Sequence, residues 1–111
     1  MTKPVIPSRL ALRDIDEAWS HYLGEAGVAV AEGFLASLEE AFALLGRQGG
    51  IGSPRWAHEL GVEGLRCWPL TGYPYLLFYF EHDDAVDLAR LLHGARDIAA
   101  TLAGPEAGGP R

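Results

Sequence analysis

Two arginines in the C-terminal half of the chain have both the chemistry and the placement of a candidate site. Arg66 and Arg90 each lie in a largely apolar stretch that favours a β-strand. We expect these strands to be antiparallel neighbours, which would bring the two guanidinium groups together on a sheet face that no helix covers. Guanidinium groups hold oxyanions such as phosphate through paired hydrogen bonds. In the alternative interpretation, each arginine faces solvent and binds an aspartate or glutamate.

His93, Arg96 and Asp97, which follow Arg90 in the sequence, are further candidates for this site. The imidazole of His93 can act as a general acid or base near neutral pH, but we favour a partly buried histidine that is hydrogen-bonded to the backbone. Asp97 has the position of an N-cap for a short helix over residues 97–102. Arg96 is expected to pair with a carboxylate of the first helix, such as Asp14. Structural roles are therefore favoured for Arg96 and Asp97.

Aromatic and thiol side chains supply the other candidates. Tyr79 lies in a run of six apolar or aromatic residues, so we expect a core side chain with its hydroxyl group at the rim rather than a proton donor. Trp19 falls on an apolar helix stripe and is also assigned to the core. Trp56, in a glycine-rich stretch, is the best candidate for an exposed anchor that binds a partner protein. A lone Cys67 has no partner for an internal disulfide and is expected to be an inert small hydrophobe.

The charge balance excludes several classes of function. The 111 residues carry 9 basic and 15 acidic side chains, a net charge of −6, and Lys3 is the only lysine. Proteins that bind free nucleic acid usually have a basic excess, because phosphate contacts supply much of their affinity. His58 and Glu59 are too sparse to hold a metal, and the glycines of residues 46–52 do not form a phosphate-binding loop. We expect no metal, no cofactor and no direct binding of free nucleic acid.

The helices and strands that position these residues can be predicted from the spacing of apolar residues and from the glycines and prolines that mark turns. Residues 3–9 contain two prolines and predict an edge strand. A helix with Ser8 as N-cap follows, with apolar residues on one side and charged residues, Asp14 among them, mostly on the other. Gly24 and Gly27 are expected to end it. A second amphipathic helix over residues 28–45 then completes a helical hairpin, which Gly46 terminates.

The second half of the chain predicts strands. Residues 46–64 form a glycine-rich connector, and three strands follow at residues 65–70, 75–80 and 86–93, joined by two tight turns. The order predicts an α+β fold, β-α-α-β-β-β, with the hairpin packed on one face of a small, mostly antiparallel sheet and a short C-terminal helix. We expect one domain over residues 1–103 and a disordered Gly/Pro-rich tail over 104–111. With no secretory signal and no apolar run of membrane-spanning length, the expected location is the cytoplasm.

Three segments in this order resemble the RelE/ParE family of toxins from type II toxin–antitoxin modules. They are Gly64-Leu65-Arg66-Cys67-Trp68-Pro69-Leu70, Gly72-Tyr73-Pro74-Tyr75-Leu76-Leu77-Phe78-Tyr79 and Arg90-Leu91-Leu92-His93-Gly94-Ala95-Arg96-Asp97. The resemblance covers roughly residues 4–98. It implies a cognate antitoxin, of ribbon-helix-helix or similar type, as partner.

The resemblance implies two different activities, because the family is divided. ParE-like members bind and poison DNA gyrase, and RelE-like members cut messenger RNA on the ribosome. The third segment is similar to the ParE-like side, and Phe80 stands where many relatives have a basic residue, so we expect a gyrase poison rather than an enzyme. Arg66, Arg90 and Arg96 are then the target-binding residues, and Trp56 contacts the antitoxin. The alternatives are an mRNA endoribonuclease with Arg66, Arg90 and His93 as catalytic residues, or a non-toxic protein of the same fold.

Overall fold

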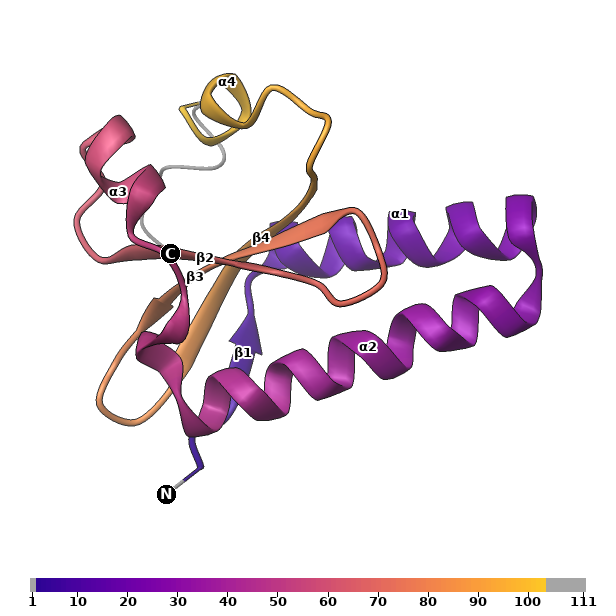
Figure 1. The fold of residues 1–111 in the computed structure, drawn as a ribbon, viewed down its shortest axis with the longest axis horizontal. Coiled ribbons are helices and arrows are strands. Elements are labelled where there is room, and N and C mark those ends of the chain that lie inside the picture. Colours follow the sequence, from indigo (N-terminus) through magenta and orange to yellow (C-terminus); the bar gives the residue numbers. More distant parts are fainter. Residues whose placement is uncertain (1, 104–111) are drawn as a thin grey trace.

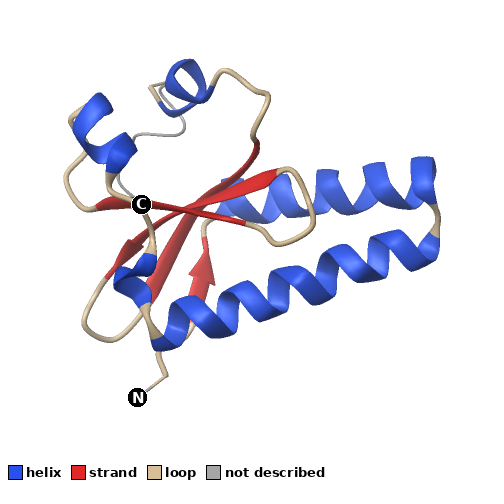
Figure 2. Cartoon of the chain, viewed as in Figure 1, coloured by secondary structure: helices blue, strands red, loops and turns tan. Residues whose placement is uncertain are grey.

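A four-stranded sheet lies at the centre of the fold, with helices on both of its faces (Figures 1 and 2). The computed structural model describes residues 2–103, so the expected disordered tail over 104–111 lies outside the described residues. Along the chain the elements are β1 (Val5–Pro7), α1 (Arg9–Ala26), α2 (Val28–Arg47), the 3₁₀ turn η1 (Gly49–Ile51), α3 (Arg55–Leu60), β2 (Leu65–Pro69), β3 (Tyr75–Glu81), β4 (Val86–His93) and α4 (Ile98–Leu102).

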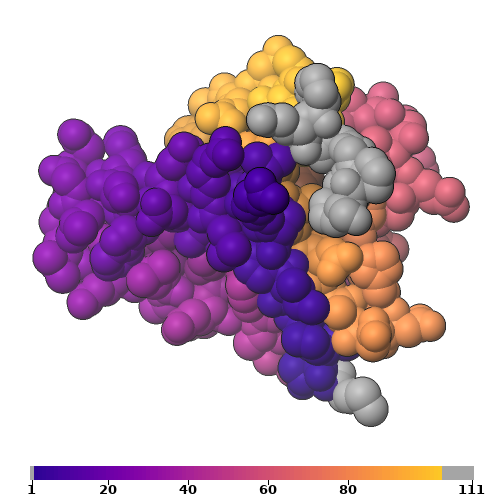
Figure 3. Space-filling view, turned by 180° about the vertical axis from the view of Figure 1, so that it is seen from behind, coloured from indigo at the N-terminus to yellow at the C-terminus, as the bar shows by residue number. Residues whose placement is uncertain are grey.

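The strand order is β1-β4-β3-β2. Strands β2, β3 and β4 form the predicted antiparallel meander, while β1 pairs in parallel with β4 at the edge of the sheet. β1 and α1 both contact β4, and in the view from behind the helical hairpin projects to one side (Figure 3). The predicted α+β fold and its element order are confirmed. β2 and β4, however, are separated by β3, so the prediction that Arg66 and Arg90 lie on neighbouring strands is wrong.

The helical hairpin begins and turns at the predicted residues. The side chain of Ser8 accepts a hydrogen bond from the amide of Ala11 at 3.0 Å, which satisfies one free N–H of the first turn. Gly24 lies inside α1, and the chain reverses at Gly27, whose φ of 95° favours glycine. Within residues 2–103, no helix is long and apolar enough to cross a membrane.

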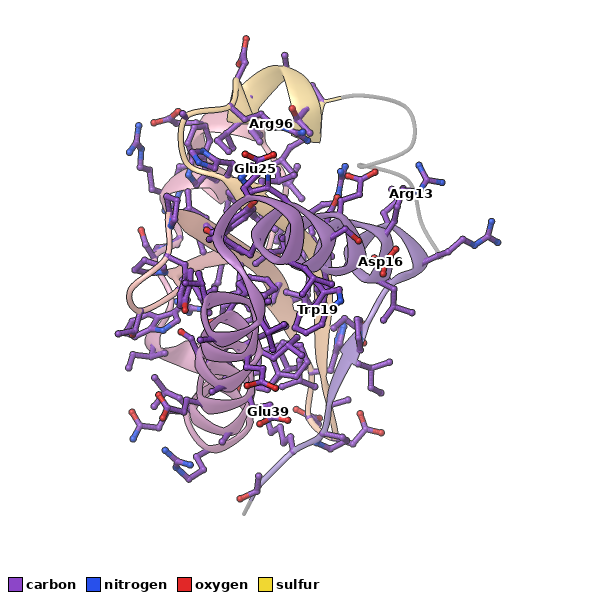
Figure 4. All side chains as sticks on the ribbon, turned by 90° about the vertical axis from the view of Figure 1, so that its right-hand side faces the viewer. Arg13, Asp16, Trp19, Glu25, Glu39 and Arg96 are labelled. Atoms are coloured by element: carbon purple, nitrogen blue, oxygen red, sulfur yellow. The ribbon has the colours of Figure 1, made fainter. Side chains whose placement is uncertain are left out.

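The core on the hairpin side of the sheet is the larger of two. Its fully buried side chains include Phe34 and Leu45 of α2, Leu77 and Tyr79 of β3, and Leu88 of β4. Trp19 packs against this cluster, as predicted. In Figure 4 Trp19 points inward beneath α1, whereas Arg13 projects away from the sheet.

The opposite face of the sheet is also covered, which corrects the expectation of a bare sheet face. Residues 55–60, predicted as part of an irregular connector, form α3, and α4 begins at its predicted cap, where Asp97 accepts a hydrogen bond from the amide of Ala100. Side chains from both helices pack with Leu65, Cys67, Phe78 and Leu92 in a second cluster. Two short helices therefore cover the second face, of which α4 was predicted and α3 was not.

Candidate functional site

Arg90 on β4 is bound by a carboxylate of α1. Its Nε and Nη2 atoms donate to the two carboxylate oxygens of Asp14 at 2.7 and 2.9 Å, and the backbone amide of Leu91 donates to the same carboxylate at 3.0 Å. The side chains of Arg90 and Asp14 are only 11% and 7% exposed. The carboxylate thus receives three hydrogen bonds at a position where little water can reach it. This ion pair ties α1 to the middle of the sheet.

The predicted pairing of Arg96 with Asp14 is wrong. Residues 11, 14 and 18 follow helical spacing, and all three are buried on the face of α1 that meets the sheet, so Asp14 points to β4 rather than to the segment after it. Arg96 is exposed, and its side chain has no hydrogen bond or ion pair within the described chain. Burial raises the pKa of the Tyr75 hydroxyl, and the positive charge of Arg96 nearby opposes that rise. Arg96 therefore lies near Tyr75, and Figure 4 shows it on the segment that leads into α4, above Glu25.

Arg66 on β2 has a different environment from Arg90. Its Nη1 atom donates to the backbone carbonyl of Gly52 at 2.7 Å, and the side chain is half-buried. The hydroxyl of Tyr79, its register partner on β3, donates to the carbonyl of Gly49 at 2.6 Å and accepts from the amide of Gly52 at 2.9 Å. Burial raises the pKa of this hydroxyl, and the hydrogen bond from Gly52 and the charge of Arg66 oppose the rise. Arg66 of β2 and Tyr79 of β3 thus both bind the loop over residues 49–52.

The loop held by Arg66 and Tyr79 also requires glycine. A Cβ atom at Gly52 would collide with the hydroxyl group of Tyr79, and one at Gly49 would collide with the carboxylate of Glu81. The backbone of Ser53 then pairs with Cys67 across the outer edge of β2, with both hydrogen bonds at 2.9 Å. The prediction that the Tyr79 hydroxyl lies at the rim of the core is wrong, because the loop from η1 to Ser53 covers it.

The residues proposed for RNA cleavage do not converge. Arg66 pairs in register with Tyr79, whereas His93 pairs with Tyr75, about 13 Å further along β3. His93 is exposed rather than partly buried, although the expected bond to the backbone is present: its Nδ1 atom accepts from the amide of Ala95 at 3.0 Å. Arg90 faces Asp14 instead of either residue. Three separate environments therefore replace the expected cluster.

Trp56 is less exposed than the sequence predicts. It lies in α3, packs half-buried against the second core cluster, and contacts the ring of Phe78 with centroids 6.3 Å apart. The guanidinium group of Arg55 lies 4.8 Å from the centroid of its ring. Cys67 is buried, and this burial raises the pKa of its thiol to about 11, which agrees with the predicted inert side chain.

Comparison with known proteins identifies the family to which this fold belongs. A family model described as ParE toxin of type II toxin-antitoxin system, parDE, matches residues 5–98. The chain belongs to the ParE toxin family. A search of the curated proteins found no match. Among solved structures, a chain described as the chromosomal ParDE TA system from P. aeruginosa matches with a TM-score of 0.67 and 20% identity, covering 83% of this chain and 96% of that chain.

Two features of this ParE-family chain were missed by reasoning from sequence. The charge pattern predicts Asp14 on the solvent side of α1, but its spacing from Ala11 and Ala18 puts it on the buried stripe. The glycine-rich sequence predicts an irregular connector at Gly52, yet the amide and carbonyl groups of Gly52 bind Tyr79 and Arg66. No local signal marks Gly52, because its partners lie on strands that follow in the chain.

Proposed function

We propose that this chain is the toxin of a type II toxin–antitoxin module, that a cognate antitoxin neutralises it, and that it acts by binding DNA gyrase in the cytoplasm. Membership of the ParE family supports the toxin assignment. The observation that favours binding over RNA cleavage is the separation of Arg66, Arg90 and His93 into three environments. Arg66 and Arg96 are the target contacts in this proposal, whereas Arg90 stabilises the fold by binding Asp14 of α1.

The electrostatics of the chain also favour a protein target. A nuclease that acts on ribosome-bound RNA needs several cations directed at one stretch of phosphates. Here the net charge is −6, and Arg90, one of the three candidate arginines, is bound by a buried carboxylate. A protein surface can be recognised by a few well-placed groups without a basic face.

Trp56 remains our proposed contact for the antitoxin, through the part of the ring that stays accessible in α3. An antitoxin of ribbon-helix-helix or similar type would bind the folded toxin, and ligand binding to a folded state stabilises it by several kcal/mol at about 100 times the dissociation constant. The cognate protein should therefore raise the melting temperature of this chain. An unchanged melting temperature in excess antitoxin would argue against neutralisation by direct binding.

The proposed function is tested by inducing the chain in growing cells and by assaying the purified protein. We expect growth arrest, inhibited supercoiling by gyrase, and intact mRNA on translating ribosomes. Ribosome-dependent cleavage of mRNA with normal supercoiling would instead establish the RelE-like alternative. Normal growth and no effect on either reaction would identify a non-toxic protein of the same fold.

A further inference from the structure

A hollow of about 520 Å³ lies between α3 and the segment that leads into β2. Its lining includes Pro54, Ala57, His58, Glu63, Leu65 and Arg66. Among residues 2–103, three basic side chains are partly buried, and two of them have acidic partners: Lys3 binds Glu81 and Arg90 binds Asp14. Arg66 is the third, and it has no acidic partner within this described part of the chain.

The guanidinium group of Arg66 is held in place yet keeps donors available. Within residues 2–103 its side chain makes one hydrogen bond, from Nη1 to the carbonyl of Gly52 at 2.7 Å, and that loop is itself fixed by Tyr79. The edge formed by Nε and Nη2 makes no hydrogen bond within the described chain. This edge matches the two oxygens of a carboxylate, as the bond between Arg90 and Asp14 illustrates. Because Arg66 is already ordered, binding there costs little side-chain entropy.

We propose that this hollow binds one acidic side chain, an aspartate or glutamate, of the partner protein on which the toxin acts. The inference rests on the proposed function, in which that partner is gyrase. Arg66 shares the lining with Glu63, His58 and several small or apolar residues. Glu63 and the net charge of −6 oppose any anion, but they oppose one carboxylate less than a nucleic-acid strand that carries several phosphates. We therefore favour a single carboxylate.

The chemistry of the hollow can be tested without gyrase. The probes are N-acetylglutamate methylamide, its glutamine analogue and inorganic phosphate, each titrated into the full-length protein while the Nε–Hε resonances of arginine are followed by NMR. The Arg66→Gln variant identifies the Arg66 resonance. We expect the glutamate derivative to move the Arg66 resonance and to leave that of exposed Arg13 in place, with no shift from the glutamine analogue. No shift at Arg66, an equal shift at Arg13, or a shift with phosphate alone would overturn the proposal.

The partner is tested by gyrase inhibition with Arg66→Gln and Arg66→Lys, beside Arg13→Gln as a matched control on the exposed side of α1. Loss of a desolvated charge contact predicts a rise of about 30-fold or more in the inhibitory concentration for Arg66→Gln. Arg66→Lys should recover only part of the loss, because an ammonium group cannot donate two parallel bonds. Unchanged inhibition by Arg66→Gln would overturn this inference and leave the proposed function intact. If the parent fails to inhibit gyrase, the proposed function fails, and the NMR titration still decides whether the hollow accepts a carboxylate.

Discussion

Arg90 and Arg66 flank the central strand β3 from opposite sides and serve different purposes. Arg90, on β4, is bound by both oxygens of Asp14 and lies at the junction with α1. Arg66, on β2, donates one hydrogen bond to a carbonyl group and borders an open hollow. Within the part of the chain that the structure describes, one arginine is therefore paired with a carboxylate, and the other keeps donors that make no hydrogen bond.

This difference indicates that the charge of Arg90 stabilises the fold, whereas the charge of Arg66 is available to a partner protein. A buried arginine with a carboxylate partner contributes to stability mainly because either group alone would be a buried, unpaired charge. A half-buried arginine that is held by a carbonyl group keeps its positive charge for an incoming anion. Substitutions at the two sites should therefore separate stability from activity.

The largest effect is expected at the ion pair between Arg90 and Asp14. Arg90→Ala and Asp14→Ala should each lower the free energy of unfolding by about 3–5 kcal/mol, because each leaves the other charge buried and unpaired. The double variant Arg90→Met with Asp14→Leu should recover much of that loss. Denaturant unfolding measures all three, with exposed Arg13→Ala as control. Parental stability of both single variants would contradict the structural role of Arg90.

The next effect concerns the core beneath the hairpin. Leu77 of β3 and Leu38 of α2 are buried between the sheet and the hairpin, at 0% and 6% exposure. Truncation of either to alanine should cost about 2–5 kcal/mol, the usual range for a buried leucine. Leu12→Ala, at a position that is 54% exposed, is the matched control and should change little. If the thermal melts of Leu77→Ala and Leu12→Ala coincide, the assignment of this core is wrong.

A smaller effect is expected at the tyrosine that holds the Arg66 loop. Tyr79→Phe removes the acceptor of the Gly52 amide and the donor to the Gly49 carbonyl. Leaving these buried groups unpaired should cost about 1–3 kcal/mol. Amide hydrogen exchange at Gly52 should also accelerate more than exchange in β4. Unchanged exchange at Gly52 would show that Tyr79 does not fix the loop.

The smallest effect is expected from ionisation of Cys67. Its thiol pKa is raised from 9.0 to about 11 in the folded protein, so the folded state binds this proton more tightly than the unfolded chain does. The resulting stabilisation is present below pH 9 and is lost as the pH rises toward 11. Cys67→Ala should remove that part of the alkaline decline in stability. Rapid reaction of the native thiol with Ellman's reagent at pH 8 would contradict this environment.

Local patterns predicted the elements better than the contacts between them. Ser8, Gly27 and Asp97 mark helix ends through hydrogen bonds and backbone angles that depend on a few adjacent residues, and the structure confirms all three. The predicted strand over residues 86–93 has the observed bounds. Such features follow from hydrophobic period and capping chemistry, which the sequence displays directly.

The errors concern residues whose partners lie far along the chain. Asp14 and Arg90 are 76 residues apart, and both Arg90 and Arg96 were plausible partners for a carboxylate on α1. Arg90 is the partner of Asp14 because α1 packs against β4, and not against the segment that follows β4. Similarly, residues 55–60 form a helix by packing against the far face of the sheet, where tertiary contacts outweigh the many flanking glycines.

The most direct measurement is a paired comparison of growth arrest and thermal stability for Arg66→Gln and Arg90→Gln, each induced to the same level of folded protein. We predict that Arg66→Gln lowers the free energy of unfolding by only about 1 kcal/mol, the usual net value of one hydrogen bond such as that to the Gly52 carbonyl, and no longer arrests growth. Arg90→Gln should lose stability, and the part that remains folded should still be toxic. Full toxicity of stable Arg66→Gln, or a parental melting curve for Arg90→Gln, would contradict the division of roles between the two arginines.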